Sequence, residues 1–144
     1  MASRHLSMKR AASIAPTAAI PAADDMIELN DMTFYAYHGV FSQERTVGGR
    51  YSVSLRLHAD FDAATRSDDL ADTLDYAAAA TIVKAEMERP SNLIEHVSRR
   101  IAERLLDAFP QLDSVDVRIC KHHPPVSGME IAEACFTASF SRND

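Results

Sequence analysis

The sequence predicts an α+β fold, a mostly antiparallel sheet in the order ββααββ with both helices packed on one face. Apolar and polar residues alternate along two stretches within residues 26–61 and along two more within residues 115–141. Between them, residues 68–109 change to the composition and spacing of helices. Two pairs of strands that flank two consecutive helices are typical of α+β domains, whose helices gather on one side of the sheet.

The first two strands are predicted from residue alternation. In "YSVSLRLHADF", residues 51–61, every second residue is apolar, which indicates a strand with one buried face. "MIELNDMTFYAY", residues 26–37, predicts an earlier strand of the same kind. The segment between them contains Gly39 and the pair Gly48 and Gly49, which fits a long hairpin connection.

The first helix is predicted within "DDLADTLDYAAAATIVKAEMERP", residues 68–90. Its alanine run has high helix propensity, and Pro90 ends the helical pattern. Three residues before the alanine run are suitable N-caps, namely Asp72, Thr73 and Asp75.

The second helix is predicted within "SNLIEHVSRRIAERLLDAF", residues 91–109. Apolar residues recur along one side of it, at Leu93, Ile94, Val97, Ile101, Leu105 and Phe109. The opposite side is polar and carries Arg99, Arg100, Glu103 and Arg104. We therefore expect an amphipathic helix docked on the sheet.

The last two strands are predicted around residues 115–120 and 134–141, and Lys121 follows the first of them. Lys121 has the same parity as Val115, Val117 and Ile119, so a continued strand would point its stem toward the core-facing side. The lysine then either extends past the strand end to water or is partly desolvated. Desolvation disfavours an ammonium ion and suits a proton-transferring amine, so both interpretations stay open from these residues alone.

Composition and charge exclude several partners. The formal net charge is −6, and residues 1–23 contain three basic and no acidic residues, so the rest of the chain carries −9. A domain with this negative charge repels the phosphate backbone of DNA or RNA, which argues against a nucleic acid as the binding partner. No stretch approaches the ~18 apolar residues that a membrane span needs. Cys120 and Cys135 lack CxxC spacing and cannot make a disulfide framework, which predicts a reducing, cytoplasmic location.

Residues 1–25 differ in composition from residues 26–144, which we expect to form one domain. The first segment is rich in alanine and serine, basic, and interrupted by Pro16 and Pro21. It shares this composition with organelle transit peptides. The simpler interpretation, which we favour, is a disordered extension or a start codon assigned too far upstream.

Four motifs carry a resemblance to a known family. They are "FYAYHGVFSQE" at 34–44, "DTLDYA" at 72–77, "NLIEHVSRRIAERL" at 92–105 and "KHHPPVSG" at 121–128. In this order, over residues 27–142, they resemble the dihydroneopterin aldolase family of folate biosynthesis, which has the tunnelling fold. The resemblance implies a lyase that splits 7,8-dihydroneopterin into 6-hydroxymethyl-7,8-dihydropterin and glycolaldehyde.

The family's chemistry implies that no cofactor is needed. Aldolases usually stabilise the carbanion with a lysine Schiff base or a metal ion. In this family the imine of the dihydropterin itself accepts the electrons. The sequence agrees, since its six histidines and its acidic residues show no HxxxH or comparable spacing of metal ligands.

The resemblance assigns roles within the pocket. Lys121 matches the catalytic lysine, a general acid and base near the ring imine. Glu95 matches the carboxylate that anchors the pterin, and Val40, Leu93 and Ile94 are expected to line the pterin slot. A structural alternative for Glu95 is a capping box with the residue at position 92, which has the required spacing.

Two further residues are expected from a neighbouring subunit. Tyr76 matches a catalytic tyrosine, and Glu44 matches a residue that binds the side-chain hydroxyl groups of the substrate. Their structural alternatives are a buried tyrosine in a first helical turn and an exposed loop carboxylate. The resemblance implies a homo-octamer of two stacked tetramers with shared active sites. We interpret His38 as structural, and His122, where many relatives carry proline, as a loop residue.

Other functions of the same fold remain as alternatives. An epimerase acting on dihydroneopterin or its triphosphate would use the same lysine, tyrosine and glutamates, and Arg45 and Arg50 provide charge for a triphosphate. A zinc-dependent pterin synthase would require a histidine triad. A non-catalytic pterin-binding relative would retain Glu95 but would lack the lysine.

Overall fold

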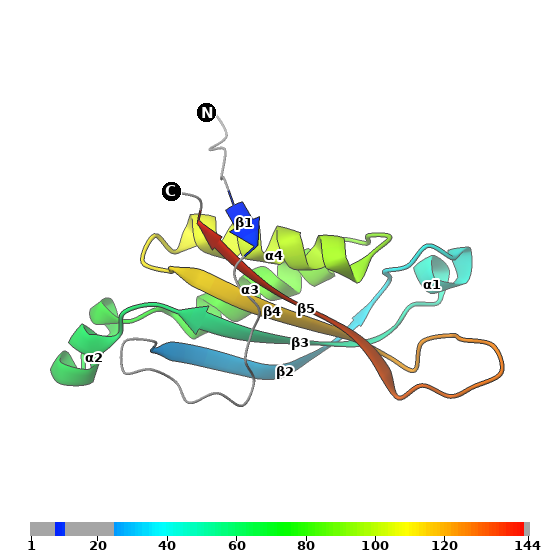
Figure 1. The fold of residues 1–144 in the computed structure, drawn as a ribbon, viewed down its shortest axis with the longest axis horizontal. Helices are drawn as coiled ribbons and strands as arrows, with labels where there is room; N and C mark the ends of the chain where they lie inside the picture. The colour runs from blue at the N-terminus through cyan, green and yellow to red at the C-terminus, as the bar shows by residue number, and fades with distance from the viewer. Residues whose placement is uncertain (1–7, 11–24, 143–144) are drawn as a thin grey trace.

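The computed structural model describes residues 8–10 and 25–142. A five-stranded antiparallel sheet in the order β1-β5-β4-β3-β2 carries the two long helices, which lie on one side of it (Figure 1). The elements are β1 (Met8–Arg10), β2 (Met26–Ala36), α1 (Ser42–Thr46), β3 (Gly49–His58), α2 (Asp62–Ser67), the 3-10 helix η1 (Leu70–Asp72), α3 (Tyr76–Met87), α4 (Ile94–Ala108), β4 (Ser114–His122) and β5 (Glu133–Arg142). The predicted α+β class and the ββααββ order of the main elements are confirmed.

The core lies between the sheet and the two long helices. On β3 the inward-facing side chains of Val53, Leu55 and Leu57 are at most 1% exposed, as the predicted alternation requires. From α4, Val97 and Ile101 pack against them and are fully buried. Each such side chain contributes about 1.5–3 kcal/mol by leaving water, so this interface fixes α4 on the sheet.

The structure contains elements that the sequence analysis did not anticipate. The short helices α1 and α2 and the 3-10 helix η1 occupy stretches expected to be connections or part of the first long helix. That helix begins only at Tyr76, because Asp75 caps it by accepting hydrogen bonds from the N–H groups of Ala77 and Ala78. The strand β1 pairs with the end of β5, at residues 140–142. The rest of the proposed extension, apart from Asp25, lies outside the described residues.

A buried ion cluster joins α3 to α4. The side chain of Glu86 is 1% exposed and pairs with Arg89, Arg100 and Arg104. The shortest of these contacts, 2.7 Å, is to Arg100, whose side chain is only 13% exposed. Arg100, predicted on the polar side of its helix, is thus no free surface charge, because it turns toward the buried carboxylate.

The two cysteines form a disulfide that the cysteine count did not predict. Cys120 on β4 and Cys135 on β5 are direct partners in the strand pairing, with Cα atoms 4.0 Å apart. The pairing of β4 with β5 thus brings the two cysteines together, although 15 positions separate them in the sequence. Among the described residues, no helix combines the length and the hydropathy required to cross a bilayer.

Candidate active site

Lys121 lies near the end of β4, directly opposite Tyr51 of β3. Its side chain is 21% exposed, and its Nζ donates a hydrogen bond to Glu44 Oε2 at 2.6 Å. The same ammonium lies 5.9 Å from the centre of the Tyr51 ring. The parity argument is thus confirmed: the stem follows the core-facing side, and the amine is partly desolvated and paired rather than free in water.

Glu44 reaches Lys121 from the same chain. It lies in the first turn of α1, within the connection between β2 and β3, and its side chain is 13% exposed. Its second oxygen, Oε1, accepts from the Phe41 N–H at 3.4 Å. The expectation that a neighbouring subunit supplies Glu44 to this pocket is wrong, because the connection folds back across the ends of β3 and β4. The exposed-carboxylate alternative is wrong for the same reason.

Gly39 is required by the position of Glu44. Its φ of +147° lies outside the range that L side chains readily adopt, and a Cβ there would stand 2.5 Å from the carboxyl carbon of Glu44. Its N–H donates to the Ser91 carbonyl at 2.9 Å, in the segment that leads into α4. The absence of a side chain at Gly39 therefore lets the Glu44 carboxylate lie directly against the backbone.

The predicted residues other than Tyr76 line one pocket of about 290 Å³. They are Val40, Glu44, Leu93, Ile94, Glu95 and Lys121. Glu95 belongs to the first turn of α4, and Leu93 is its N-cap residue. An apolar slot with a carboxylate at one wall and an ammonium at another can hold a flat heterocycle with N–H donors along one edge.

The capping-box alternative for Glu95 is not observed. Leu93 occupies the N-cap position without a side-chain cap hydrogen bond. Asn92, the residue expected to cap, accepts a hydrogen bond from Arg45 Nη1 at 2.9 Å instead. The carboxylate of Glu95 therefore lines the pocket and does not close its own helix.

A second pocket of about 380 Å³ borders the same ion pair. It shares Phe41, Glu44, Lys121, Pro124 and Pro125 with the first pocket, and its other lining residues are Gln43, Val47, Gly48, Gly49, Tyr51, His122 and His123. Gln43 and Tyr51 were not among the predicted site residues. The register of β3 against β4 would have indicated Tyr51, but alternation alone does not give register.

Two buried groups beneath the ion pair remain neutral near pH 7. Burial, assisted by Arg100, Lys121 and Arg45, lowers the pKa of His38 to about 4. Its Nδ1 accepts from the Ser91 N–H at 3.1 Å, which agrees with the structural role expected for it. Burial, followed by the charge of Glu44, raises the pKa of Tyr51 to about 12. His122, expected in a loop, is the last residue of β4.

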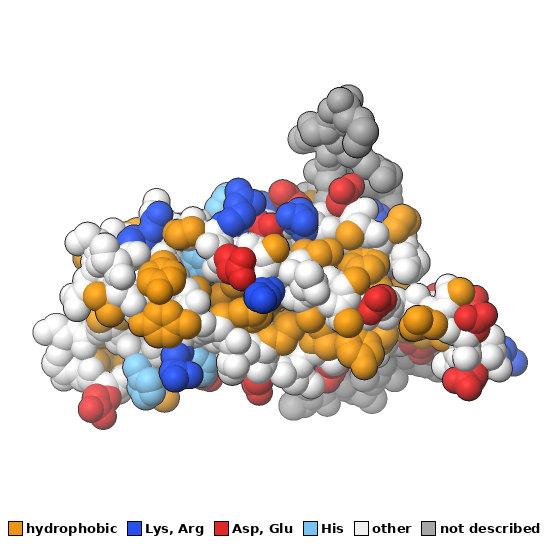
Figure 2. All heavy atoms as spheres, turned by 180° about the vertical axis from the view of Figure 1, so that it is seen from behind, with side chains coloured by type: hydrophobic (Ala, Val, Ile, Leu, Met, Phe, Trp, Pro, Cys, Tyr) orange, Lys and Arg blue, Asp and Glu red, His pale blue; other side chains and the backbone are white. Residues whose placement is uncertain are grey.

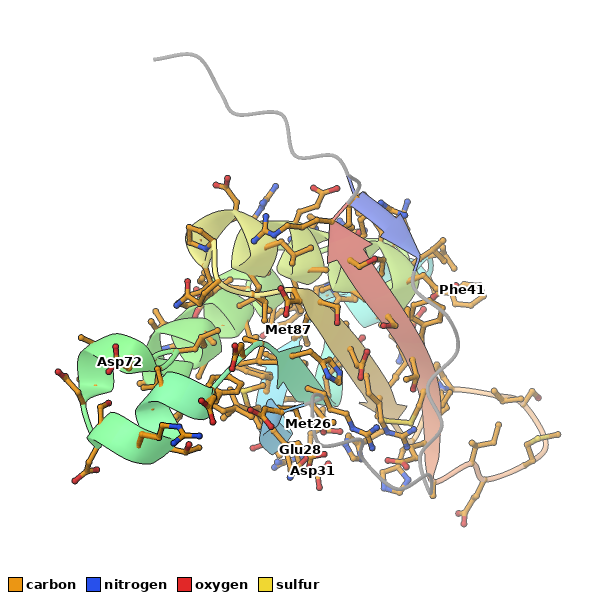
Figure 3. All side chains as sticks on the ribbon, turned by 60° about the vertical axis from the view of Figure 1, so that its left-hand side comes forward. Met26, Glu28, Asp31, Phe41, Asp72 and Met87 are labelled. Carbon is orange, nitrogen blue, oxygen red and sulfur yellow. A yellow bond between two sulfur atoms is a disulfide. The ribbon has the colours of Figure 1, made fainter. Side chains whose placement is uncertain are left out.

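Tyr76 lies at the opposite end of the sheet from Lys121. It is the first residue of α3 and is 58% exposed, so the alternative of a buried tyrosine is wrong. Figure 3 shows this separation: Asp72, just before Tyr76, lies on one side of the molecule, and Phe41, at the rim of the pocket, on the other. Within one chain, Tyr76 does not line either pocket that Lys121 borders.

One group of potential metal ligands occurs in the described part of the chain. The ligand atoms of Cys120, Glu133 and Cys135 lie within 4.8 Å of one another. The two sulfur atoms are joined in the disulfide, and the Arg118 guanidinium lies 3.4 Å from Cys135 Sγ and 3.6 Å from Glu133. A cation at this position would face both a bonded sulfur pair and a positive charge, so the residues present do not fit a metal ion.

Comparison with known proteins places this geometry in a family. A family model described as FolB, dihydroneopterin aldolase, matches residues 27–137. The dihydroneopterin aldolase of Staphylococcus epidermidis is 40% identical over 106 residues, which cover 73% of this chain and 88% of that protein.

Two solved structures share the fold. FolB of Vibrio cholerae superposes with a TM-score of 0.75 at 24% identity, covering 82% of this chain and 98% of the other. Escherichia coli dihydroneopterin aldolase in complex with neopterin has a TM-score of 0.68 at 24% identity, covering 78% and 97%. By the sequence match over most of its length, this chain belongs to the dihydroneopterin aldolase family.

Proposed function

We propose that this protein is a dihydroneopterin aldolase, which cleaves the side chain of 7,8-dihydroneopterin to release glycolaldehyde. The single observation that supports this activity most strongly is the shared pocket of Lys121 and Glu95, with Glu44 at 2.6 Å from the amine. A pterin needs a carboxylate for its N–H edge, and a retro-aldol cleavage needs a proton donor near the ring imine. Both groups border one cavity.

The reaction assigns a task to each group. Glu95 accepts hydrogen bonds from the amino group and ring N–H of the pterin, with Leu93 and Ile94 beside the ring. The side-chain hydroxyl at C2′ loses its proton, the C1′–C2′ bond breaks, and the electron pair moves into the ring imine. The proton of that hydroxyl passes to Glu44, and Lys121, as an ammonium, supplies a proton to the imine nitrogen. Carbon C1′ of the resulting enamine then takes up the proton from Glu44, and the ring nitrogen returns its proton to Lys121, which gives 6-hydroxymethyl-7,8-dihydropterin. Glu44 holds this ammonium in place and accepts a hydrogen bond from the substrate hydroxyl.

We further propose that Tyr76 completes the site from a neighbouring copy, within the homo-octamer that the family implies. Tyr76 is exposed at the start of α3 and lines neither pocket next to the Lys121 of its own chain. Several apolar residues are exposed around the α1 end of the molecule, where Figure 2 shows hydrophobic side chains gathered. They are Tyr37, Val40, Phe41, Val47 and Leu93. Such a surface suits contact with another copy of the chain.

The positions of two arginines argue against a triphosphate substrate. Arg45 is engaged by Asn92 Oδ1 at 2.9 Å and lies within 3.5 Å of the Gly39 carbonyl oxygen. Arg50 lines a different pocket, with Thr33 and Tyr35, and borders neither cavity next to Lys121. A side chain without phosphate groups therefore fits the site better than the triphosphate of the epimerase alternative.

A direct assay tests the proposal. Purified protein is incubated with 7,8-dihydroneopterin in EDTA, and glycolaldehyde is measured for the wild type, Lys121→Ala, and the exposed-lysine control Lys84→Ala. We expect the Lys121 variant to lose activity by about 100-fold or more, and the control to match the wild type. Cleavage that survives in Lys121→Ala would remove the lysine from the mechanism. An isomerised product without aldehyde would identify an epimerase.

A further inference from the structure

We propose that Tyr51 is a positioning residue of the active site, which holds the Lys121 amine and the Gly39 rim of the pocket at a fixed separation. This inference rests on the proposed role of Lys121. Tyr51 is 2% exposed and borders the second pocket, but it does not line the pocket of Glu95, which is proposed to hold the pterin. Its two ends contact different walls: the ring faces the amine, and the hydroxyl reaches the backbone of the β2–β3 connection.

The ring end restrains the amine. Tyr51 and Lys121 are directly opposed in the pairing of β3 with β4, and Nζ lies 5.9 Å from the ring centre. This is within the range of attraction between a cation and an aromatic ring. With Glu44 Oε2 at 2.6 Å, the ammonium has one charged and one aromatic partner. Two partners restrict a flexible lysine stem more than a single ion pair does.

The hydroxyl end restrains the rim of the pocket. Tyr51 donates a hydrogen bond to the His38 carbonyl at 2.7 Å, and its ring meets the His38 ring edge to face, with centres 5.2 Å apart. The next residue, Gly39, donates to the Ser91 carbonyl at 2.9 Å. Ser91 leads into Leu93 and Glu95, the residues proposed to hold the pterin. One buried tyrosine thus links the amine on β4 to the pterin-facing wall before α4.

Tyr51 keeps its proton wherever the enzyme works. Burial, followed by the nearby Glu44 charge, raises its pKa to about 12, so the hydroxyl donates throughout the neutral range. A phenol that holds its proton so firmly, and that does not line the pocket of Glu95, does not transfer the proton to a substrate. Its contribution is therefore geometric, and changes to it should affect binding and catalysis in separable ways.

Two substitutions separate the two ends. Tyr51→Phe keeps the ring and removes the hydroxyl, so we expect KM for 7,8-dihydroneopterin to rise about tenfold, because the His38 carbonyl loses its buried donor. Its kcat and pH profile should stay near those of the wild type. Tyr51→Leu also removes the ring, so kcat should fall as well, because the amine loses its aromatic partner.

The matched control is Tyr35→Phe. Tyr35 donates to the Val47 carbonyl at 2.6 Å, so this change removes a tyrosine hydrogen bond to the same connection without touching Lys121 or His38. KM in Tyr35→Phe should stay within about twofold of the wild type, since this tyrosine is exposed and its lost bond is replaced by water. Melting temperatures of all three variants show whether each is folded.

The outcomes are decisive in both directions. A KM for Tyr51→Phe no different from that of Tyr35→Phe overturns the inference, as does a kcat for Tyr51→Leu no lower than that of Tyr51→Phe. If Tyr51→Leu does not fold, the KM of Tyr51→Phe against Tyr35→Phe decides alone. Failure of the proposed function would show differently, as wild-type protein that releases no glycolaldehyde, and failure of the lysine's role as full activity in Lys121→Ala, whatever the tyrosine variants do.

Discussion

Burial sets the charge state of single residues around this site, and His38 is the clearest case. Its ring is fully buried under the pocket, between the loop before α4 and the Tyr51 ring. The cations of Arg100, Lys121 and Arg45 add to the effect of burial, so protonation of this ring is opposed from several sides. A proton forced onto His38 would therefore disturb the same segment that carries the pocket.

This arrangement predicts a pH dependence of stability. The pKa of His38 is about 4 in the folded protein, against an ordinary value of 6.5 for histidine, so the unfolded chain binds more protons between these two pH values. The stabilisation is complete above pH 6.5 and is lost as pH falls toward 4, by up to roughly 3 kcal/mol. Urea unfolding at pH 7, 5.5 and 4.5 measures it. In His38→Asn, the part of the pH dependence of the unfolding free energy that comes from His38 should vanish. An unchanged pH dependence in this variant would contradict the low pKa of His38.

Gly39 gives a second prediction at this scale. In Gly39→Ala, the new Cβ would meet the Glu44 side chain at 2.5 Å on a backbone of φ +147°, so either the carboxylate or the connection must move. We expect kcat/KM to fall by at least about tenfold, because a shift of the ion pair misplaces the amine. Gly49→Ala is the control, since nothing lies within 4 Å of its Cβ. Equal activity in both variants would show that Glu44 is not held by this contact.

Among the elements, long patterned segments were predictable and short ones were not. Alternation located β2, β3, β4 and β5 because each has one buried face, and the apolar stripe located α4. The helices α1 and α2 are five and six residues long, too short for a periodic pattern. The strand β1 has three residues, and only pairing with β5 defines it. The strand β1 therefore depends on a tertiary contact with β5, which the sequence of residues 8–10 alone does not predict.

The ion cluster at Glu86 predicts how strongly the contact between α3 and α4 stabilises the fold. Arg100 also donates to the backbone carbonyls of Glu86 and Arg89, so the cluster holds the α3–α4 connection that leads to the pocket. In Glu86→Ala, the half-buried Arg100 loses its carboxylate, and the free energy of unfolding should fall by about 3 kcal/mol. Chemical denaturation measures this change. The exposed control Glu88→Ala should change it by less than about 0.5 kcal/mol; equal effects would contradict a structural role for the cluster.

At the scale of the molecule, the motifs predicted which residues border the pocket, but not which copy of the chain supplies each of them. Lys121, Glu95 and Glu44 do border one cavity, as the family resemblance implied. The resemblance placed Glu44 on a neighbouring chain, whereas the folded connection brings it to the lysine of its own chain across 77 positions. Contacts over such sequence distances depend on the path of a loop. The path of this connection depends on Gly39 and Gly48, both of which have positive φ values. The sequence shows that these glycines allow a turn, but it does not show which residues the turn brings together.

The separation of Tyr76 from Lys121 follows from the topology. β3 runs from the Lys121 end of the sheet to the far end, α2 and η1 turn the chain, and α3 begins there with Tyr76. The 12 residues of α3 then span about 18 Å on the way back. A tyrosine at the start of this helix cannot reach its own pocket, so a catalytic role requires a second copy whose far end docks at the first copy's site.

This requirement predicts complementation between two inactive variants. Lys121→Ala and Tyr76→Phe are each expected to be weak alone, because every site lacks one group. When they are unfolded, mixed and refolded together, about one quarter of the sites should join a Lys121 from one chain to a Tyr76 from another, if subunits assemble at random. Glycolaldehyde release should then rise toward a quarter of the wild-type rate. The separately refolded variants, combined only afterwards, are the control. Activity that stays at the level of the control would mean that Tyr76 does not serve a neighbour's site.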